Sequence, residues 1–210
     1  MEPICCIFGA GSYYGTEQLP DGDFFAISAD GGYETAKRMG VKPDLHIGDF
    51  DSLQSEAHAP EIIRLRPEKD DTDTLSAVKL ALERGFRVFY LYGCTGGRTD
   101  HTLSNIQVLA ELARRGCRAR MIGDREIFAA LHNDAIAFSE TSQGMISVFS
   151  LSDKSHGVTE TGLKYPLHNY TMTNGFPIGT SNEFTGQRAE ISVQDGTLLL
   201  VYTDSAVERR

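Results

Sequence analysis

The sequence predicts an α/β fold, with a Rossmann-like N-terminal domain built on a mostly parallel sheet and a smaller all-β sandwich at the C-terminus. Two observations lead to this prediction. In the first two-thirds of the 210 residues, short apolar runs alternate with segments of helical periodicity, which is typical of βαβ units. After about residue 131, helix formers become sparse and short β-like runs alternate with turn residues. We therefore expect one domain over residues 1–132 and another over residues 133–210.

Local patterns indicate each element of the α/β domain. Residues 74–84 and 102–115 carry apolar side chains at helical spacing, and Gly85 and Gly116 follow where helix C-caps belong. Six apolar runs predict the strands that alternate with helical segments: 4–8, 24–29, 45–47, 62–65, 88–92 and 119–122.

The C-terminal region has weaker strand signals. Four runs predict strands there: 145–151, 170–173, 189–193 and 197–202. Because a β unit of about 70 residues has only a marginal core of its own, we expect it to pack on the first domain or on a second subunit.

Composition excludes several classes of protein. The chain has 40% apolar residues and no apolar run long enough to span a bilayer, which excludes a membrane protein. No basic region followed by a long apolar stretch is visible at the N-terminus, so we expect a cytoplasmic location. The net charge of -9 and the lack of a basic run before the last two residues argue against a nucleic-acid surface. The four cysteines lack C-x-x-C spacing, which predicts buried, reduced thiols.

The segment Gly9–Gly15 follows a predicted strand and imitates a dinucleotide-binding fingerprint, with Asp30 about twenty residues further on. A fingerprint of this type opens a crossover helix, and residues 18–23 leave no room for one. We therefore expect a loop whose glycines let the backbone approach a ligand such as the phosphates of a nucleotide.

Aspartates recur where predicted strands end and helices begin. They are Asp30, Asp44, Asp49, Asp51, Asp70, Asp71, Asp73 and Asp100. Asp49 and Asp51 are two residues apart, so in an extended segment both carboxylates project to the same side. Two carboxylates placed in this way can form part of a site for Mg²⁺. Each aspartate alone is equally consistent with a helix cap or a turn. So many carboxylates at one sheet edge would repel one another without a cation, and their number therefore favours a metal site.

A second glycine-rich segment, residues 93–101, lies between a predicted strand and a predicted helix. Gly96 and Gly97 allow close backbone approach, and Arg98 offers a fork of donors suited to phosphate oxygens. The alternative is an ordinary turn with an exposed arginine. His101 is either a ligand contact or a solvated neighbour of the helix start.

Five motifs occur together in one order: Ala29-Asp30-Gly31-Gly32, Gly48-Asp49-Phe50-Asp51-Ser52, Asp71-Thr72-Asp73, Gly96-Gly97-Arg98-Thr99-Asp100-His101 and Thr180-Ser181-Asn182-Glu183-Phe184. With them, and with the segment 162–167, nearly the whole chain resembles the thiamine pyrophosphokinase (thiamine diphosphokinase) family. The resemblance implies transfer of the pyrophosphoryl group of ATP to the hydroxyl of thiamine, giving thiamine diphosphate and AMP. It also implies Mg²⁺ and a homodimer, with thiamine held between the α/β domain of one subunit and the β domain of the other.

Residue roles follow from the same resemblance. The expected metal ligands are Asp49, Asp51, Asp73 and Asp100, of which Asp73 and Asp100, with Arg98, are also the expected catalytic residues. The expected ATP-binding residues are Asp30, Gly31, Gly96, Gly97, Arg98 and His101. Ser181 and Asn182 match the segment that meets thiamine. The chain has no tryptophan, so the ring that stacks on the pyrimidine is left open between Phe184 and a tyrosine.

Three other functions share parts of this pattern. A different Mg²⁺-dependent phosphotransferase would keep the aspartates and differ around Ser181. A nucleotide or thiamine sensor would bind without turnover, although a pure binder has little need of so many convergent carboxylates. An NAD-dependent oxidoreductase would require Gly9–Gly15 to open a helix.

Overall fold

The computed structural model describes residues 2–48, 59–66, 71–206, 208 and 209. The chain divides into two compact units, which are described separately. Unit 1 comprises Met1–Val108 and Cys117–Asp124, and unit 2 comprises Leu109–Gly116 and Arg125–Arg210. Strand β7 (Glu126–His132) therefore groups with unit 2.

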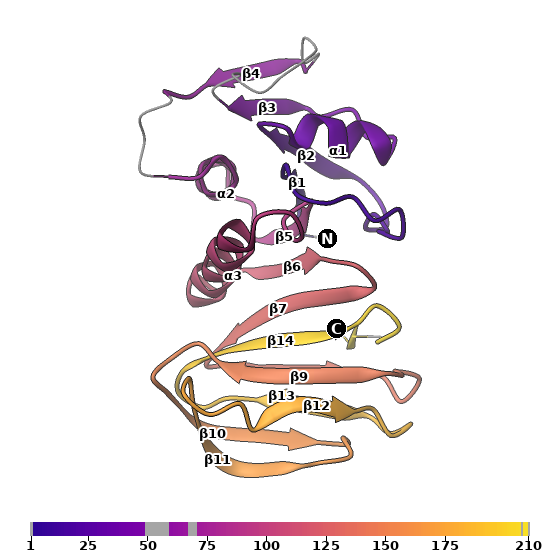
Figure 1. The fold of residues 1–210 in the computed structure, drawn as a ribbon, viewed down its shortest axis with the longest axis vertical. Coiled ribbons are helices and arrows are strands. Elements are labelled where there is room, and N and C mark those ends of the chain that lie inside the picture. Colours follow the sequence, from indigo (N-terminus) through magenta and orange to yellow (C-terminus); the bar gives the residue numbers. More distant parts are fainter. Residues whose placement is uncertain (1, 49–58, 67–70, 207, 210) are drawn as a thin grey trace. The chain divides into compact units, whose positions relative to one another are not determined.

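Unit 1 contains a parallel sheet of six strands in the order β6-β5-β1-β2-β3-β4 (Figure 1). Every registered pair in this order is parallel. Its strands are β1 (Ile4–Phe8), β2 (Phe24–Ala29), β3 (Leu45–Gly48), β4 (Glu61–Arg64), β5 (Val88–Tyr92) and β6 (Arg118–Ile122). The six predicted strands are confirmed, with ends that differ by at most one residue. These strands are apolar because helices cover the sheet: β1 and β5 are buried along almost their whole length.

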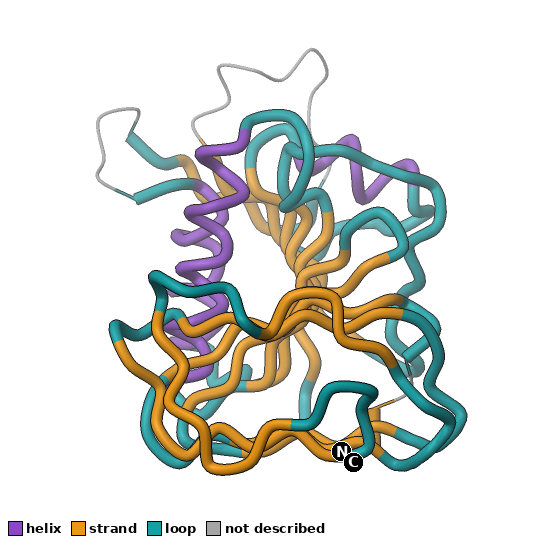
Figure 2. Tube along the Cα trace, turned by 60° about the horizontal axis from the view of Figure 1, so that its bottom comes forward, coloured by secondary structure: helices purple, strands orange, loops and turns teal. Residues whose placement is uncertain are grey.

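Helical segments lie on both sides of these strands (Figure 2). They are α1 (Gly32–Arg38), α2 (Asp73–Glu83) and α3 (Thr99–Arg114). The two predicted helices are confirmed as α2 and α3. Thr72 caps α2 by accepting a hydrogen bond from the Leu75 N–H at 3.2 Å, and Gly85, with a φ of +89°, ends it.

Helix α1 is absent from the sequence prediction because its seven residues offer too few apolar positions to establish a period. Its position depends on a glycine. A Cβ at Gly32 would stand 1.8 Å from the Phe8 carbonyl oxygen, so no other residue fits where α1 meets the end of β1.

Unit 2 contains antiparallel strands in two layers, which agrees with the all-β prediction. One layer has the order β12-β9-β14-β7 and the other the order β11-β10-β13-β8-β15 (Figure 1). The strands not yet given are β8 (Ala135–Phe138), β9 (Met145–Ser150), β10 (Lys154–Thr161), β11 (Leu167–Thr173), β12 (Gly179–Glu183), β13 (Ala189–Ser192), β14 (Thr197–Thr203) and β15 (Glu208–Arg209). Five strands lie outside the runs predicted from the sequence: β7, β8, β10, β12 and β15. In β10 and β12 the residues are mainly small or polar, and pairing with neighbours decides their conformation.

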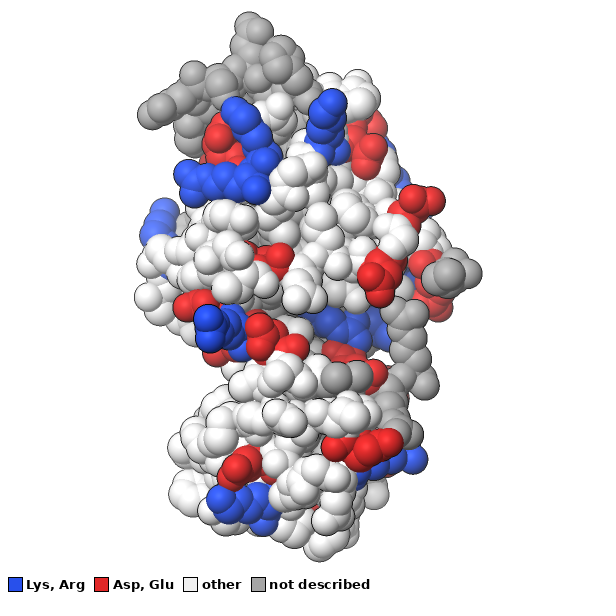
Figure 3. All heavy atoms as spheres, turned by 90° about the vertical axis from the view of Figure 1, so that its right-hand side faces the viewer, with Lys and Arg blue, Asp and Glu red and all other residues white. Residues whose placement is uncertain are grey.

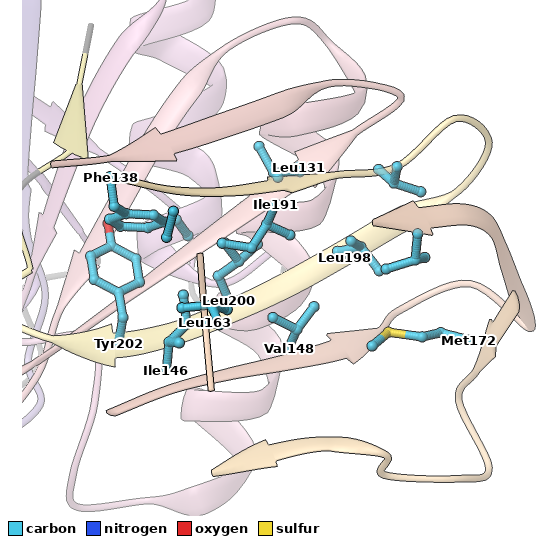
Figure 4. Close-up of a cluster of buried hydrophobic side chains, with 14 of the residues drawn as sticks. Leu131, Phe138, Ile146, Val148, Leu163, Met172, Ile191, Leu198, Leu200 and Tyr202 are labelled. Carbon is cyan, nitrogen blue, oxygen red and sulfur yellow. The ribbon is translucent and has the colours of Figure 1, made fainter. Parts of the chain in front are cut away.

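The core of unit 2 is formed by side chains from both layers that point toward one another (Figure 4). The ring of Phe138, on β8, lies 5.1 Å from the rings of Phe184 and Tyr202. Leu198 and Leu200, on β14, are fully buried in the same cluster. This apolar layer is the main source of stability for unit 2, since its strands are short and its loops polar.

Truncation of this core destabilises the chain. Leu200→Ala removes a fully buried side chain and is expected to lower the free energy of unfolding by about 3 kcal/mol. The matched control is Leu103→Ala, whose side chain is 59% exposed on α3 and whose loss is expected to change stability by less than about 0.5 kcal/mol. Urea unfolding of the two variants measures the difference, and equal midpoints would contradict this description of the core.

Candidate functional site

Four neighbouring strands of unit 1, in the order β5-β1-β2-β3, end at the same edge of the sheet. The chain runs outward from β1 through β2 and β3 and later returns to pair β5 with the other side of β1. The strand order therefore reverses at β1. Ligands of open α/β sheets bind at the carboxyl edge beside such a reversal, and the predicted site residues of unit 1 follow these strand ends.

The two glycine-rich loops lie against each other at this edge. The Gly9 N–H donates to the Tyr92 carbonyl at 2.8 Å, the Gly11 N–H to the Gly93 carbonyl at 2.7 Å, and the Ser12 N–H to the Thr95 carbonyl at 2.9 Å. Residues 9–23 contain no helix, as expected from the sequence. The loop after β1 is therefore part of a backbone platform and not the start of a crossover helix.

Glycine is required where these loops touch. A Cβ at Gly11 would stand 2.5 Å from the Thr95 carbonyl oxygen. Gly96 has a φ of +72°, and a Cβ there would stand 2.3 Å from the Ser12 hydroxyl oxygen. The two loops thus bring backbone groups close together at the reversal point, as phosphate-binding loops do.

Asp30 ends β2 in a strained conformation. Its φ of +48° lies in the left-handed region, which non-glycine residues seldom occupy outside turns and functional sites. The Asp30 N–H donates to the Ile47 carbonyl at 2.8 Å, and Gly48 lies against the Asp30 backbone. Gly31 follows directly and packs near Ala10 of the first loop. The predicted ligands Asp49 and Asp51 lie outside the described residues.

Asp73 is the first residue of α2, and the capping hydrogen bond is made by Thr72. Capping of α2 therefore does not account for the aspartate at position 73. Two other aspartates of the sequence pattern have structural partners. Asp44 accepts from the Ala26 N–H at 2.8 Å, and Asp71 pairs with Lys79 at 2.5 Å.

His46 lies on β3 close to the carboxyl edge of the sheet and was missed by sequence reasoning. The ring is fully buried on β3, with Nδ1 2.7 Å from the Ser28 hydroxyl, and Tyr33 meets it edge-on at 5.8 Å. Burial lowers the pKa of His46, and the negative charges of Asp30 and Asp73 oppose that shift. Burial remains the largest influence on the pKa of this ring. A histidine inside a predicted strand was the available signal.

Arg98 and Asp100 form an exposed pair at the start of α3. The Arg98 Nη2 donates to Asp100 Oδ2 at 2.6 Å and its Nε to Oδ1 at 3.2 Å, and the His101 N–H also donates to Oδ1. Hydrogen bonding by Arg98 lowers the pKa of Asp100. The side chains are 72% and 64% exposed, so the pair adds little stability and its partners can exchange for a ligand.

The donor chemistry of this edge suits a hard cation. Asp30 and Asp73 offer carboxylate oxygens, the ligands that Mg²⁺ prefers. Within residues 2–48, 59–66 and 71–206, no group of three metal-binding side chains is present, and two of the four expected ligands lie in the stretch 49–58. The residues present therefore fit a magnesium ion by type.

The predicted thiamine segment lies on β12 in unit 2. Ser181 is exposed, has a φ of +60° and sits in a β-bulge where the register of β12 against β9 shifts. Such a bulge turns a side chain outward from its strand. Asn182 is instead buried, and its amide bonds other parts of unit 2. Phe184 packs in the core beside Phe138, whereas Tyr165 is 61% exposed.

Acidic and basic side chains are interspersed on the face drawn in Figure 3. In the part of the chain that the structure describes, no helix is both long enough and apolar enough to cross a membrane.

Comparison with known proteins identifies the family of the chain. Residues 16–121 match the model of the thiamin pyrophosphokinase catalytic domain, and residues 135–198 match that of the thiamin pyrophosphokinase vitamin B1 binding domain. The thiamine pyrophosphokinase of Bacillus subtilis is 33% identical over 83% of this chain and 85% of its own length.

Solved structures agree with the sequence comparison. The crystal structure of the Bacillus subtilis thiamine pyrophosphokinase superposes with a TM-score of 0.82 at 28% identity and covers 95% of this chain and 98% of its own. The enzyme from Geobacillus thermodenitrificans gives a TM-score of 0.80 at 28% identity, covering 96% and 97% of the two chains. The chain therefore belongs to the thiamine pyrophosphokinase family of transferases.

Proposed function

We propose that the chain transfers the pyrophosphoryl group of ATP to the hydroxyl of thiamine in a Mg²⁺-dependent reaction, giving thiamine diphosphate and AMP. The observation that carries the proposal is the arrangement at one sheet edge. Two glycine-rich loops lie in backbone contact beside the reversal of strand order, Asp30 directly follows β2 at the same edge, and Asp73 begins α2. This combination supplies backbone groups for phosphates and carboxylates for a cation.

The transfer requires positioning more than covalent chemistry by the protein. The thiamine hydroxyl oxygen forms a bond to the β-phosphorus, the bond from that phosphorus to the oxygen bridging the α-phosphate breaks, and AMP leaves. The hydroxyl proton passes to Asp73 or Asp100. Arg98 exchanges Asp100 for phosphate oxygens and stabilises the charge that develops on the transferred group.

The residues assigned to ATP lie on the loops that lead into α1 and α3. Asp30, Gly31 and His101 are proposed as ATP contacts together with Gly96 and Gly97, whose φ values of +72° and +61° leave the backbone open to a ligand. The N-terminal turn of α3 favours an anion at the same place.

The proposed metal ligands are Asp49, Asp51, Asp73 and Asp100. A bound Mg²⁺ supplies charge neutralisation for the triphosphate and orientation of its β-phosphate. Asp73 is suited to this role because Thr72 already caps α2.

Ser181 is the proposed polar contact to thiamine, with Asn182 beside it. Tyr165 is the proposed ring that stacks on the thiamine pyrimidine, because it is exposed whereas Phe184 is packed in the core. We further propose a homodimer in which the β unit of one subunit completes the site of its partner. Large apolar side chains exposed near β12 support this arrangement: Met145, Tyr165, Phe176 and Ile178.

A cytoplasmic location is the last part of the proposal. All four cysteines are buried and free, which suits a reducing compartment. Burial raises the pKa of Cys5 and of Cys94 to about 12, so neither thiol is reactive at neutral pH.

Product analysis tests the function. Purified protein is incubated with thiamine, ATP and Mg²⁺, with EDTA as the control, and the products are separated by chromatography. We expect thiamine diphosphate and AMP in equal amounts, and neither in EDTA. ADP with thiamine monophosphate would correct the reaction to transfer of a single phosphoryl group, and binding of thiamine without turnover would indicate a sensor.

Asp73→Asn is expected to lower kcat at least about a hundredfold, because it removes a charge from the metal and phosphate site while Thr72 continues to cap α2. Asp71→Asn is the matched control. It removes a nearby charge that pairs with an exposed lysine, and kcat is expected to stay within about twofold of wild type. Steady-state kinetics and circular dichroism measure both variants, and similar kcat values for the two would remove Asp73 from the site.

Ser181→Gly separates the function of this residue from its strain. Glycine adopts a φ of +60° without steric cost, so we expect a melting temperature equal to or above that of wild type together with a KM for thiamine raised about tenfold. Ser181→Ala keeps the strain and removes only the hydroxyl, so it should raise the KM equally without a gain in stability. An unchanged KM in both variants would exclude Ser181 as a thiamine contact.

A further inference from the structure

Unit 2 contains a buried carboxylate that the proposed reaction does not use. Glu160, on β10, has no exposed surface. Its Oε2 accepts a hydrogen bond from the Asn182 Nδ2 at 3.0 Å, and its Oε1 has no hydrogen-bond partner among the described residues. A buried carboxylate with half of its capacity unused is costly, so its presence in this core requires an explanation.

Asn182, the partner of Glu160, is fully bonded by its surroundings. Its Nδ2 also donates to the Tyr165 carbonyl at 2.8 Å. Its Oδ1 accepts from the Tyr165 N–H at 3.0 Å and from the Glu183 N–H at 2.9 Å. The amide has two donor hydrogens and two acceptor sites, and all four are used. Asn182 is therefore held in one orientation, in which it fixes the backbone of Tyr165.

The Glu160–Asn182 hydrogen bond joins the two layers of unit 2. Glu160 belongs to the layer that contains β10, and Asn182 belongs to β12, the edge strand of the other layer. Among the strands that the structure describes, β12 pairs with β9, and the bulge at Ser181 interrupts this pairing. On its other side, the Glu183 carbonyl accepts from the Lys164 N–H at 3.0 Å. Because an edge strand with a bulge has few backbone hydrogen bonds, side-chain bonds of this kind determine where it lies.

We propose that Glu160 is a positioning residue for thiamine binding: its hydrogen bond to Asn182 holds Ser181 and Tyr165 in the geometry that receives the pyrimidine ring. This inference rests on the proposed function of the segment 180–184. Glu160 does not itself touch the substrate, since it has no exposed surface. Its effect is therefore expected in the KM for thiamine and not in kcat.

The protonation state of Glu160 determines how stably the Glu160–Asn182 hydrogen bond holds β12. Burial raises the pKa of Glu160 from 4.5 to about 7, and the hydrogen bond from Asn182 opposes the shift. Directly opposite Glu160 on the neighbouring strands lie the apolar residues Ile191 and Leu167. The titratable or charged groups on the elements packed against it are Lys154, His156, Lys164, Tyr165, His168, Tyr170, Glu183, Glu190 and Tyr202.

Burial is the largest influence on the pKa of Glu160, and the charged neighbours have little effect on it. Lys164 and Glu183 neutralise each other at 2.7 Å. Alternation along the strands turns Glu190 and His168 to the face opposite Glu160, because their chain neighbours Ile191 and Leu167 are its partners. Ionisation of Glu160 therefore creates a poorly compensated buried charge.

The sign of the pH effect follows from this shift. Below about pH 4.5, Glu160 is protonated in both the folded and the unfolded chain. Between about pH 4.5 and about pH 7 it ionises first in the unfolded chain, so its contribution to stability falls as pH rises. Through pH 7 the folded chain ionises as well. The charged side chain then favours an opening of β12 to water, which raises the KM for thiamine.

The experiment compares Glu160→Gln with wild type. Glutamine retains an oxygen that accepts from Asn182 and carries no charge. We expect the KM of wild type for thiamine to rise several-fold between about pH 6 and about pH 8.5, across the pKa near 7, whereas that of the glutamine variant stays constant. Glu160→Ala removes the acceptor and is expected to raise the KM about tenfold at every pH with kcat within about twofold of wild type.

Ser155→Ala is the matched control. Ser155 is fully buried on the same strand, and its hydroxyl bonds the Ser150 hydroxyl at 2.8 Å and the Thr197 carbonyl at 3.3 Å. Its loss lowers stability without changing the KM for thiamine. If the alanine variant at residue 160 does not fold, the glutamine variant alone decides the question.

Failure of this inference is distinct from failure of the proposed function. Parallel pH profiles of KM in wild type and Glu160→Gln would overturn the inference while the enzyme still makes thiamine diphosphate. If wild type makes none, the function fails. Unfolding between about pH 4.5 and about pH 7 still tests the network itself, because the stability of wild type relative to Glu160→Gln should fall there as pH rises.

Discussion

The contact between the two glycine-rich loops is the constraint on which the rest of the proposed active site depends. Two backbone hydrogen bonds join the loop after β1 to the loop after β5, and a third joins it to the last residue of β5. Glycines at positions 11 and 96 make that approach possible. The contact fixes the backbone beside the reversal of strand order, which is where an open α/β sheet binds its ligand. Asp30 directly follows β2 at this edge, and Asp73 begins α2. One edge of the sheet thus carries both the backbone groups proposed to contact phosphates and the carboxylates proposed to bind a cation.

In unit 2, side-chain hydrogen bonds hold an edge strand of small polar residues, β12, in place. Strand β12 has little apolar surface, and the strained Ser181 interrupts its pairing. The buried Asn182 adds four side-chain hydrogen bonds to the backbone contacts of this strand, and one of them reaches Glu160 in the opposite layer. A network of this kind orients a segment well and leaves it sensitive to the charge of its one ionisable member.

Much of the fold could be predicted from the sequence, because the elements of unit 1 carry strong local signals. Apolar runs such as 88–92 have few alternatives to a buried parallel strand, and α2 has both a clear period and a terminal glycine. The short helix α1 and the polar strands β10 and β12 were missed because packing rather than local preference determines them. The roles of Asn182 and Glu160 depend on pairing between distant strands and have no signal in sequence spacing. The expected ligands Asp49 and Asp51 remain predictions.

Transfer of label from ATP tests the account most directly. Protein is incubated with thiamine and Mg²⁺ and with ATP labelled either at the β- or at the γ-phosphorus, and the label is followed into the thiamine product and the nucleotide. The account predicts that both labels move together into thiamine diphosphate and that the released AMP carries neither. Transfer of the γ-label alone, with the β-label left in ADP, would show attack at the terminal phosphorus and contradict the proposed reaction at this edge.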